Sequence, residues 1–234
     1  LLIRHERVRG RIGQPSVPLA LNPDGAFAIG IKIGRRSTDW LLVDFTGHVR
    51  QRKTLSYAFP DADVLLPILG QNMDALRDEL GAMAPRLVGV GVAAPFQLGG
   101  WHKMLGLSDV QSNTWNQIDL SAAVQGMTDL PVSFAKDTSA ACVAELVAGR
   151  GRDLKSFLYL FVDTFVGGGL VINSHLHGGI HGNAGAVASL PLHLAGSGSG
   201  TPEQLLSHAS LWELEQHFKI HGLDPTAAYD ERAM

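Results

Sequence analysis

The stretch FLYLFVDTFVGGGLVINSHLHGGIHGNAGAVASLPL, residues 157–192, is the most informative part of the sequence. It opens with an apolar run rich in β-forming residues, is interrupted by Gly167–Gly169, and continues as Leu170–Ile172. Apolar runs bounded by glycine are typical of a β-hairpin. Four more glycines follow in a loop that contains histidine, and glycine permits close backbone approach or positive φ. The stretch predicts two strands followed by a glycine-rich loop.

The glycine run between the two apolar segments has two interpretations. Glycine is the default turn residue, so the run can serve a turn alone. Alternatively, its backbone N–H groups can form a cradle for a phosphate or another ligand. Composition does not choose between these interpretations.

The same stretch resembles the ROK family (repressors, open reading frames and sugar kinases). Kinase members carry here a strand, a glycine/threonine phosphate turn, a second strand, and a histidine–glycine loop with a sugar-binding glutamate. The positions that match this pattern are Thr164, Gly167–Gly169, His181, Gly182 and Gly185. The resemblance extends from about residue 9 to about residue 218 and implies that the second lobe is incomplete.

Composition restricts the class of protein. The chain has 234 residues, 45% of them hydrophobic, which suffices for one large or two small domains. A net charge of −3 argues against a global basic field for nucleic acid. The single cysteine, Cys142, excludes an internal disulfide and fits a reducing cytoplasm. No apolar run of ~18 residues is present, so no membrane span is expected, and the arginine-rich N-terminus is not followed by the apolar core of a signal peptide.

The first half of the chain has strand patterns followed by a helix. Alternation over residues 26–33, followed by two further strand-like segments at 38–45 and 48–57 with a Thr46–Gly47 turn between them, predicts an antiparallel meander. A helix is expected at about 62–81, and a buried strand at 87–94. The order of three strands, a helix and a strand is that of the N-terminal part of the actin-like ATPase (ribonuclease H-like) fold, which ROK proteins share. The resemblance therefore implies an α/β fold with two lobes.

The rest of the chain is less regular. Residues 96–117 are rich in loop-forming residues, and short helices are expected at 119–126 and 138–148. A strand is expected at 130–135 and a last helix at 202–218.

Residues 1–22 differ from the body in being rich in arginine and proline. One interpretation is a loosely ordered terminal arm. The other follows from the resemblance, which implies the remnant of a winged-helix wing and linker, with the recognition helix upstream. The body is then expected to comprise an N-terminal lobe at 23–128 and a truncated C-terminal lobe at 129–234.

Asp137 is the foremost candidate for chemistry. It lies between a predicted strand and a predicted helix, in FAKDTSAA, where aspartate is also a favoured N-cap. In ROK kinases an aspartate at this place is the general base that takes the sugar hydroxyl proton. Phosphoryl transfer also needs bound phosphates and a metal.

The phosphate turns of the kinases are altered in this chain. Lys32 stands where the metal-associated aspartate belongs, and the bulky Arg35 follows. In the second turn Asp163 and Phe165 replace glycines, so charge and bulk both oppose a phosphate there. The resemblance thus implies a degenerate phosphate site made of Lys32, Gly34, Arg35, Thr164, Phe165, Gly167 and Gly168.

The sugar loop is altered as well, since the family's glutamate falls on Ala186 and its zinc-binding histidine on Ser189. No metal is expected, although His175, His177 and His181 are close in sequence. Trp115 is either a core residue or a stacking face for a sugar ring. The expected ligand-binding residues are Asn113, Asp137, His181 and Gly182.

The leading hypothesis is a ROK transcriptional regulator whose sugar-kinase-like body binds a sugar effector without phosphotransfer. Its expected partners are the effector, DNA through an upstream module absent from this chain, and a second copy in a cytoplasmic homodimer. No cofactor is expected. The alternative is an active sugar kinase that uses ATP and magnesium with Asp137 as base. A third hypothesis is a scaffold without a ligand.

Overall fold

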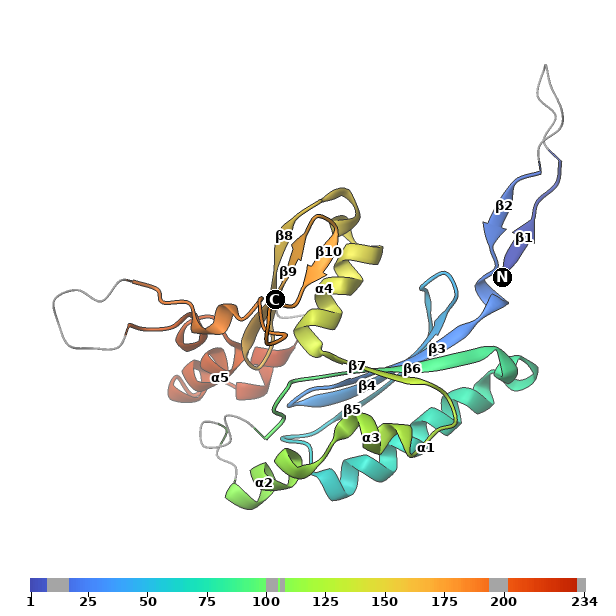
Figure 1. Cartoon of the computed structure of the whole chain (residues 1–234). Helices are drawn as coiled ribbons and strands as arrows, with labels where there is room; N and C mark the ends of the chain where they lie inside the picture. The colour runs from blue at the N-terminus through green and yellow to red at the C-terminus, as the bar shows by residue number, and fades with distance from the viewer. Residues whose placement is uncertain (8–16, 100–104, 106–107, 194–201, 231–234) are drawn as a thin grey trace. The chain divides into compact units, whose positions relative to one another are not determined.

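The computed structural model describes residues 1–7, 17–99, 105, 108–193 and 202–230. The chain forms two compact units, Leu1–Asp137 and Thr138–Met234 (Figure 1). This division comes later than the expected boundary after residue 128. The reason is that β7 (Val132–Lys136) pairs in parallel with β6 (Leu87–Ala94) and so belongs to the first unit.

The first unit contains a mixed sheet of five strands in the order β5-β4-β3-β6-β7. The expected meander is present as antiparallel pairs of β3 with β4 and of β4 with β5. Strands β3, β6 and β7 run parallel, so their carboxyl ends lie at one end of the sheet. The first three strands are β3 (Phe27–Ile33), β4 (Ser37–Asp44) and β5 (Val49–Ser56).

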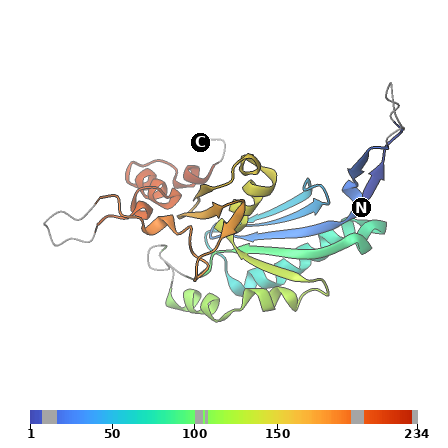
Figure 2. The ribbon, with the colours of Figure 1, turned by 45° about the horizontal axis from the view of Figure 1, so that its top comes forward.

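One face of this sheet carries the helices α1 (Ala62–Glu79) and α3 (Leu120–Gln125) (Figures 1 and 2). Alternate residues of β3 are buried, as the sequence pattern predicts. Leu65, Leu69 and Leu76 recur at helical spacing on α1 and are buried in the same core. Burial of each such side chain contributes about 1.5–3 kcal/mol.

A helix, α2 (Asp109–Gln117), lies where the sequence predicted loop. The loop prediction for this segment was wrong because α2 is polar along most of its length. Among the α2 residues whose burial is described, Ser112 and Trp115, three positions apart, are the buried ones. Two anchor positions are too few to produce a recognisable helical period.

The N-terminal segment forms a small antiparallel hairpin of β1 (Leu2–Arg4) and β2 (Leu19–Leu21). Ile3 pairs with Ala20. Residues 8–16, part of the segment expected to be a wing remnant, lie outside the described residues.

The second unit is built on a three-stranded antiparallel sheet in the order β10-β9-β8. Helix α4 (Asp137–Ala148) begins at Asp137, as expected, and precedes this sheet in the chain. The last helix is shorter than expected, because Ser210 caps it and residues 205–207 form a separate 3-10 turn. The elements are β8 (Phe157–Val162), β9 (Val166–Ile172), β10 (His175–His177) and α5 (Leu211–Ile220).

The glycine run lies inside β9, so the prediction that it interrupts the two strands was wrong. Gly167, Gly168 and Gly169 pair in register with residues of β8, and the turn is formed by residues 163–165. A Cβ on Gly167 would lie 2.7 Å from the Thr138 methyl group, and one on Gly169 would lie 2.4 Å from Cβ of Cys142. The glycines therefore let α4 pack directly against the strand.

No helix in the described part of the chain is both long enough and apolar enough to cross a membrane.

Candidate functional site

The carboxyl ends of β3, β6 and β7 form the candidate site of the first unit. The register places Lys32 beside Ala93, and Ala94 beside Lys136. Ligands of open α/β sheets bind outside the carboxyl ends of parallel strands. The segments that follow these strands therefore supply the candidate ligand contacts.

A cleft of about 560 Å³ lies between the segment after β6 and helix α2. This volume is within the range of small-molecule sites. Asn113, one of the expected ligand contacts, is exposed and lines the cleft. Most of the other lining side chains are aromatic, amide or hydroxyl groups, and the full lining is Phe96, Gln97, Gly99, Ser112, Asn113, Trp115, Asn116 and Ile118.

Trp115 is a core residue that also forms part of the cleft wall. Its side chain is 6% exposed, and its Nε1 donates a hydrogen bond of 2.8 Å to the Pro60 carbonyl. The Ser112 hydroxyl donates to the Gly99 carbonyl at 2.9 Å. These two bonds hold α2 to the chain before α1 and to the segment after β6. Of the two interpretations of Trp115, its burial favours the core role.

The first expected phosphate turn is a closed hairpin turn. The Gly34 N–H donates to the Ser37 carbonyl at 2.8 Å, and the Tyr57 hydroxyl donates to the Gly34 carbonyl at 2.9 Å. A phosphate cradle needs backbone N–H groups that point to the ligand. Here the N–H of Gly34 is used within the turn.

Arg35 occupies the space beside this turn. The residue is 8% exposed, and one guanidinium nitrogen, Nη2, donates to the Gln97 carbonyl at 3.1 Å. The arginine thus links the end of β3 to the segment after β6. Lys32 lies next to the turn, since its Nζ would be 3.4 Å from a Cβ on Gly34.

Asp137 and Lys136 lie at the junction of β7 and α4. Asp137 is the first residue of the helix and is half-buried. The Nζ atom of Lys136 lies 5.6 Å from the centroid of the Phe96 ring, on the cleft wall. Burial lowers the pKa of Lys136, and the nearby Asp137 carboxylate partly opposes that shift.

In the second unit, the expected second phosphate turn packs against helix α5. The N–H groups of Leu211 and Trp212 donate to the carbonyls of Asp163 and Thr164 at 3.0 and 3.2 Å. The Asp163 carboxylate accepts from the Thr164 N–H at 2.6 Å. The free N–H groups at a helix start are the usual anion-binding groups. These two N–H groups of α5 instead bind the turn.

Phe165 belongs to a small core. It packs with Ala188 and Leu205 against a cluster of three buried residues, Val166, Val187 and Leu206. Thr164 is 3% exposed. Gly168 faces the following loop, because a Cβ there would lie 2.9 Å from the Gly185 carbonyl oxygen. The turn residues therefore build the unit's interior.

The histidine loop is open to solvent. His181 and Gly182 are exposed, and Gly182 has a φ of +67°. Ala186, at the family's glutamate position, is half-buried. In the described part of the chain, no group of three His, Cys, Asp or Glu side chains is arranged to hold a metal ion.

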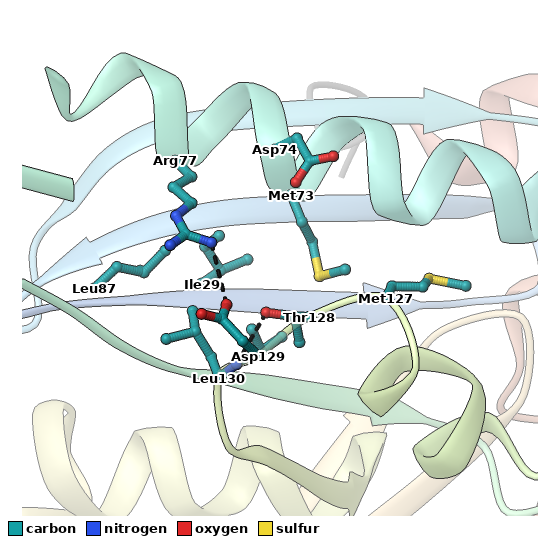
Figure 3. A pocket seen from close by; sticks show the side chains of 10 residues that line it. Ile29, Met73, Asp74, Arg77, Leu87, Met127, Thr128, Asp129 and Leu130 are labelled. Atoms are coloured by element: carbon teal, nitrogen blue, oxygen red, sulfur yellow. Dashed lines mark hydrogen bonds and ion pairs between the residues drawn. The ribbon is translucent and has the colours of Figure 1, made fainter. Parts of the chain in front are cut away.

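A second, smaller hollow of about 100 Å³ lies toward the start of β6 (Figure 3). Arg77 of α1 reaches across it to the Asp129 carboxylate at 3.2 Å, and its apolar lining includes Ile29 and Leu87. Small-molecule sites occupy about 300–1,000 Å³. This hollow is too small to hold a sugar ring.

The ROK family profile matches residues 28–203, which is most of the chain. The chain belongs to the ROK family. The xylose repressor of Bacillus subtilis is 22% identical over 202 residues, which are 86% of this chain and 50% of the repressor. The chain spans about half the length of the curated ROK regulators it matches.

Solved ROK structures confirm the actin-like ATPase fold. A ROK family transcriptional regulator, a homologue of the E. coli MLC protein, aligns with a TM-score of 0.66 at 20% identity. The match covers 89% of this chain and 52% of the regulator. The ROK hexokinase from Thermus thermophilus aligns with a TM-score of 0.59 at 20% identity, over 88% of this chain and 71% of its own.

Several residues of the candidate site were not found from the sequence. They are Phe96, Gln97, Ser112, Asn116 and Lys136. The available signal was the end of the buried strand at Pro95, since segments after parallel strands bind ligands. The helix that supplies Ser112 and Asn116 had no recognisable pattern.

Proposed function

We propose that this chain is the effector-sensing body of a ROK transcriptional regulator that has lost phosphotransfer. It binds a sugar or sugar derivative in the cleft beside Asn113, at the carboxyl ends of β3, β6 and β7 where Asp137 also lies. No cofactor is required for this role.

The position of Arg35 carries the proposal. The Arg35 guanidinium is buried and bound to the Gln97 carbonyl, beside the turn that the family resemblance aligns with a phosphate turn of the kinases. The closed turn at Gly34 and the binding of the Asp163–Thr164 carbonyls by α5 support the same conclusion. The cleft beside α2 supplies polar groups for sugar hydroxyls.

The whole regulator acts in the cytoplasm as a homodimer and binds DNA through a winged helix-turn-helix upstream of this chain. Effector binding shifts the population between two arrangements of the regulator, which requires a different affinity for each. Operator binding by the full-length protein that responds to no sugar would contradict this coupling.

A thermal-shift plate tests effector binding on the chain itself. A ligand that binds only the folded state raises the apparent stability by mass action. Monosaccharides, phosphosugars and polyols are each tested with and without Mg·ATP. The expected result is a shift with one sugar class and none with Mg·ATP alone. A shift with Mg·ATP alone would contradict the loss of the nucleotide site.

The second candidate function is an ATP- and magnesium-dependent sugar kinase. It is favoured by Asp137, which lies at a strand–helix junction and which the resemblance matches to the family's general base. Hexokinase structures share the fold. Phosphorylation of a hexose that is lost in Asp137→Asn would establish it.

A further inference from the structure

The candidate site carries positive charge, although the chain as a whole is negative. The segments at the carboxyl ends of the three parallel strands, residues 32–37, 94–99 and 135–137, contain four cations and one acid, so 4 − 1 = +3. The whole chain has a net charge of −3. Counting also Asp109, the first residue of α2, and Asp119, just after the helix, leaves 3 − 2 = +1. A charged cleft concentrates ligands of the opposite sign.

Two of these cations lie next to residues that line the cleft, without lining it themselves. Arg35 donates to the carbonyl of Gln97, and the ammonium group of Lys136 lies 5.6 Å from the Phe96 ring centroid. Phe96 and Gln97 both line the cleft. The positive groups therefore lie behind one wall, at the β3–β6–β7 side.

The opposite wall is neutral. Helix α2 contributes Ser112, Asn113 and Asn116, whose hydroxyl and amide groups donate and accept hydrogen bonds. Such groups suit sugar hydroxyls. The cleft thus has a neutral polar side and a cationic side.

We propose that the effector is an anionic sugar, one that carries a phosphate or a carboxylate. The inference rests on the proposed function. The sugar hydroxyls contact the amides of α2, and the anion faces Lys136 and Arg35. An anion beside Lys136 offsets the cost of burying its charge, a cost that also lowers the pKa of this lysine.

The test is a titration of the 234-residue chain with matched ligands: a hexose, its 6-phosphate and its uronic acid, with inorganic phosphate as the ion control. The expected result is that one anionic member binds about tenfold or more tightly than the neutral hexose, as one charge-assisted contact provides. The 6-phosphate and the uronic acid distinguish the two anionic groups. Binding of inorganic phosphate as tight as that of the sugar phosphate would overturn the sugar assignment.

A variant pair locates the anion. Lys136→Gln is expected to weaken the anionic sugar about tenfold and the neutral hexose less than about twofold. The start of α1 lies beside the cleft, because Trp115 of the cleft wall donates to the Pro60 carbonyl. Arg77 lies about 22 Å farther along this helix, at a rise of about 1.5 Å per residue. The control Arg77→Gln therefore removes a distant cation and is expected to leave both affinities unchanged. Equal losses for the two sugars in Lys136→Gln would overturn the proposal.

The salt dependence of binding to the wild-type chain tests the same proposal, even if Lys136→Gln does not fold. Added salt screens charged contacts, so the advantage of the anionic sugar over the neutral hexose should shrink as salt rises. An advantage that is independent of salt would overturn the inference. A hexose that binds while its anionic forms do not would overturn it and leave the proposed function standing. No binding by any sugar would overturn both.

Discussion

At the scale of single residues, the close approach of α4 to β9 depends on glycines in the strand, which have no side chain. A Cβ on Gly169 would lie 2.4 Å from Cβ of Cys142 and 2.8 Å from its sulfur. Cys142 is fully buried, so neither atom can move into open space. The strand and helix must separate to admit a methyl group.

Gly169→Ala is therefore expected to lower the free energy of unfolding by about 1–3 kcal/mol, the usual cost of overpacking a core. Gly91→Ala is the matched control, because Gly91 also lies in a strand but a Cβ there would meet no atom within 4 Å. Denaturant unfolding of both variants measures the difference. Equal free energies of unfolding for the two variants would show that α4 and β9 separate at little energetic cost.

Asp44 is a buried carboxylate whose hydrogen bonds hold the turn between β4 and β5. It accepts from the hydroxyl and N–H of Thr46 at 2.6 and 2.9 Å, and from Nε of Arg50 at 2.7 Å. The Thr46 hydroxyl lowers the pKa of Asp44 most; burial opposes it, and the bonds from Arg50 and from the backbone lower it further. The charged form is thus favoured in the folded state.

A pKa that is lower in the folded chain stabilises the fold above the unfolded pKa of about 3.9, and this stabilisation is lost as the pH falls below about 4. The free energy of unfolding of the wild type is therefore expected to fall from about pH 5 to about pH 2, in part because Asp44 becomes protonated. Asp44→Asn should show a flatter pH dependence in urea unfolding. An identical dependence in both proteins would refute the role of Asp44.

At the scale of elements, helix α1 begins at a side-chain cap, Asp61. The Asp61 carboxylate accepts from the N–H groups of Asp63 and Val64 at 3.0 and 3.4 Å. These N–H groups have no partner within the helix, so the cap satisfies donors that are otherwise left to water.

Asp61→Ala should destabilise the chain by about 1 kcal/mol, as the loss of an N-cap usually does. Asp74→Ala removes the same charge from the C-terminal half of α1, where Asp74 is exposed and lies at the edge of the hollow beside the sheet (Figure 3). Alanine has the higher helix propensity, so this control should be neutral or slightly stabilising. Thermal unfolding of the two variants compares them, and an equal loss in both would argue against capping.

At the scale of the whole molecule, the two altered phosphate turns predict a body without phosphotransfer. ATP-dependent phosphorylation of hexoses and pentoses should not exceed background in the wild type, and Asp137→Asn should not change this result. A coupled assay for ADP, with an active ROK glucokinase as positive control, measures it. Turnover in the wild type that Asp137→Asn abolishes would reverse the assignment.

Much of the fold was predictable because its signals are local. The alternation in β3 and the helical spacing in α1 each involve residues within a few positions of one another. The place of Asp137 between a strand and a helix is of the same kind. The motifs that carried the family resemblance also lie in short segments of the chain.

The sequence by itself thus determined the α/β class, the meander, the helix α1 and the ROK family resemblance. The tertiary structure decided what the glycines of β9 do, that α2 is a helix, and that Arg35 closes the turn beside Gln97. Each of these depends on residues far apart in the chain, such as Arg35 and Gln97. Periodicity and composition describe one segment at a time, whereas such packing is determined only when the segments meet.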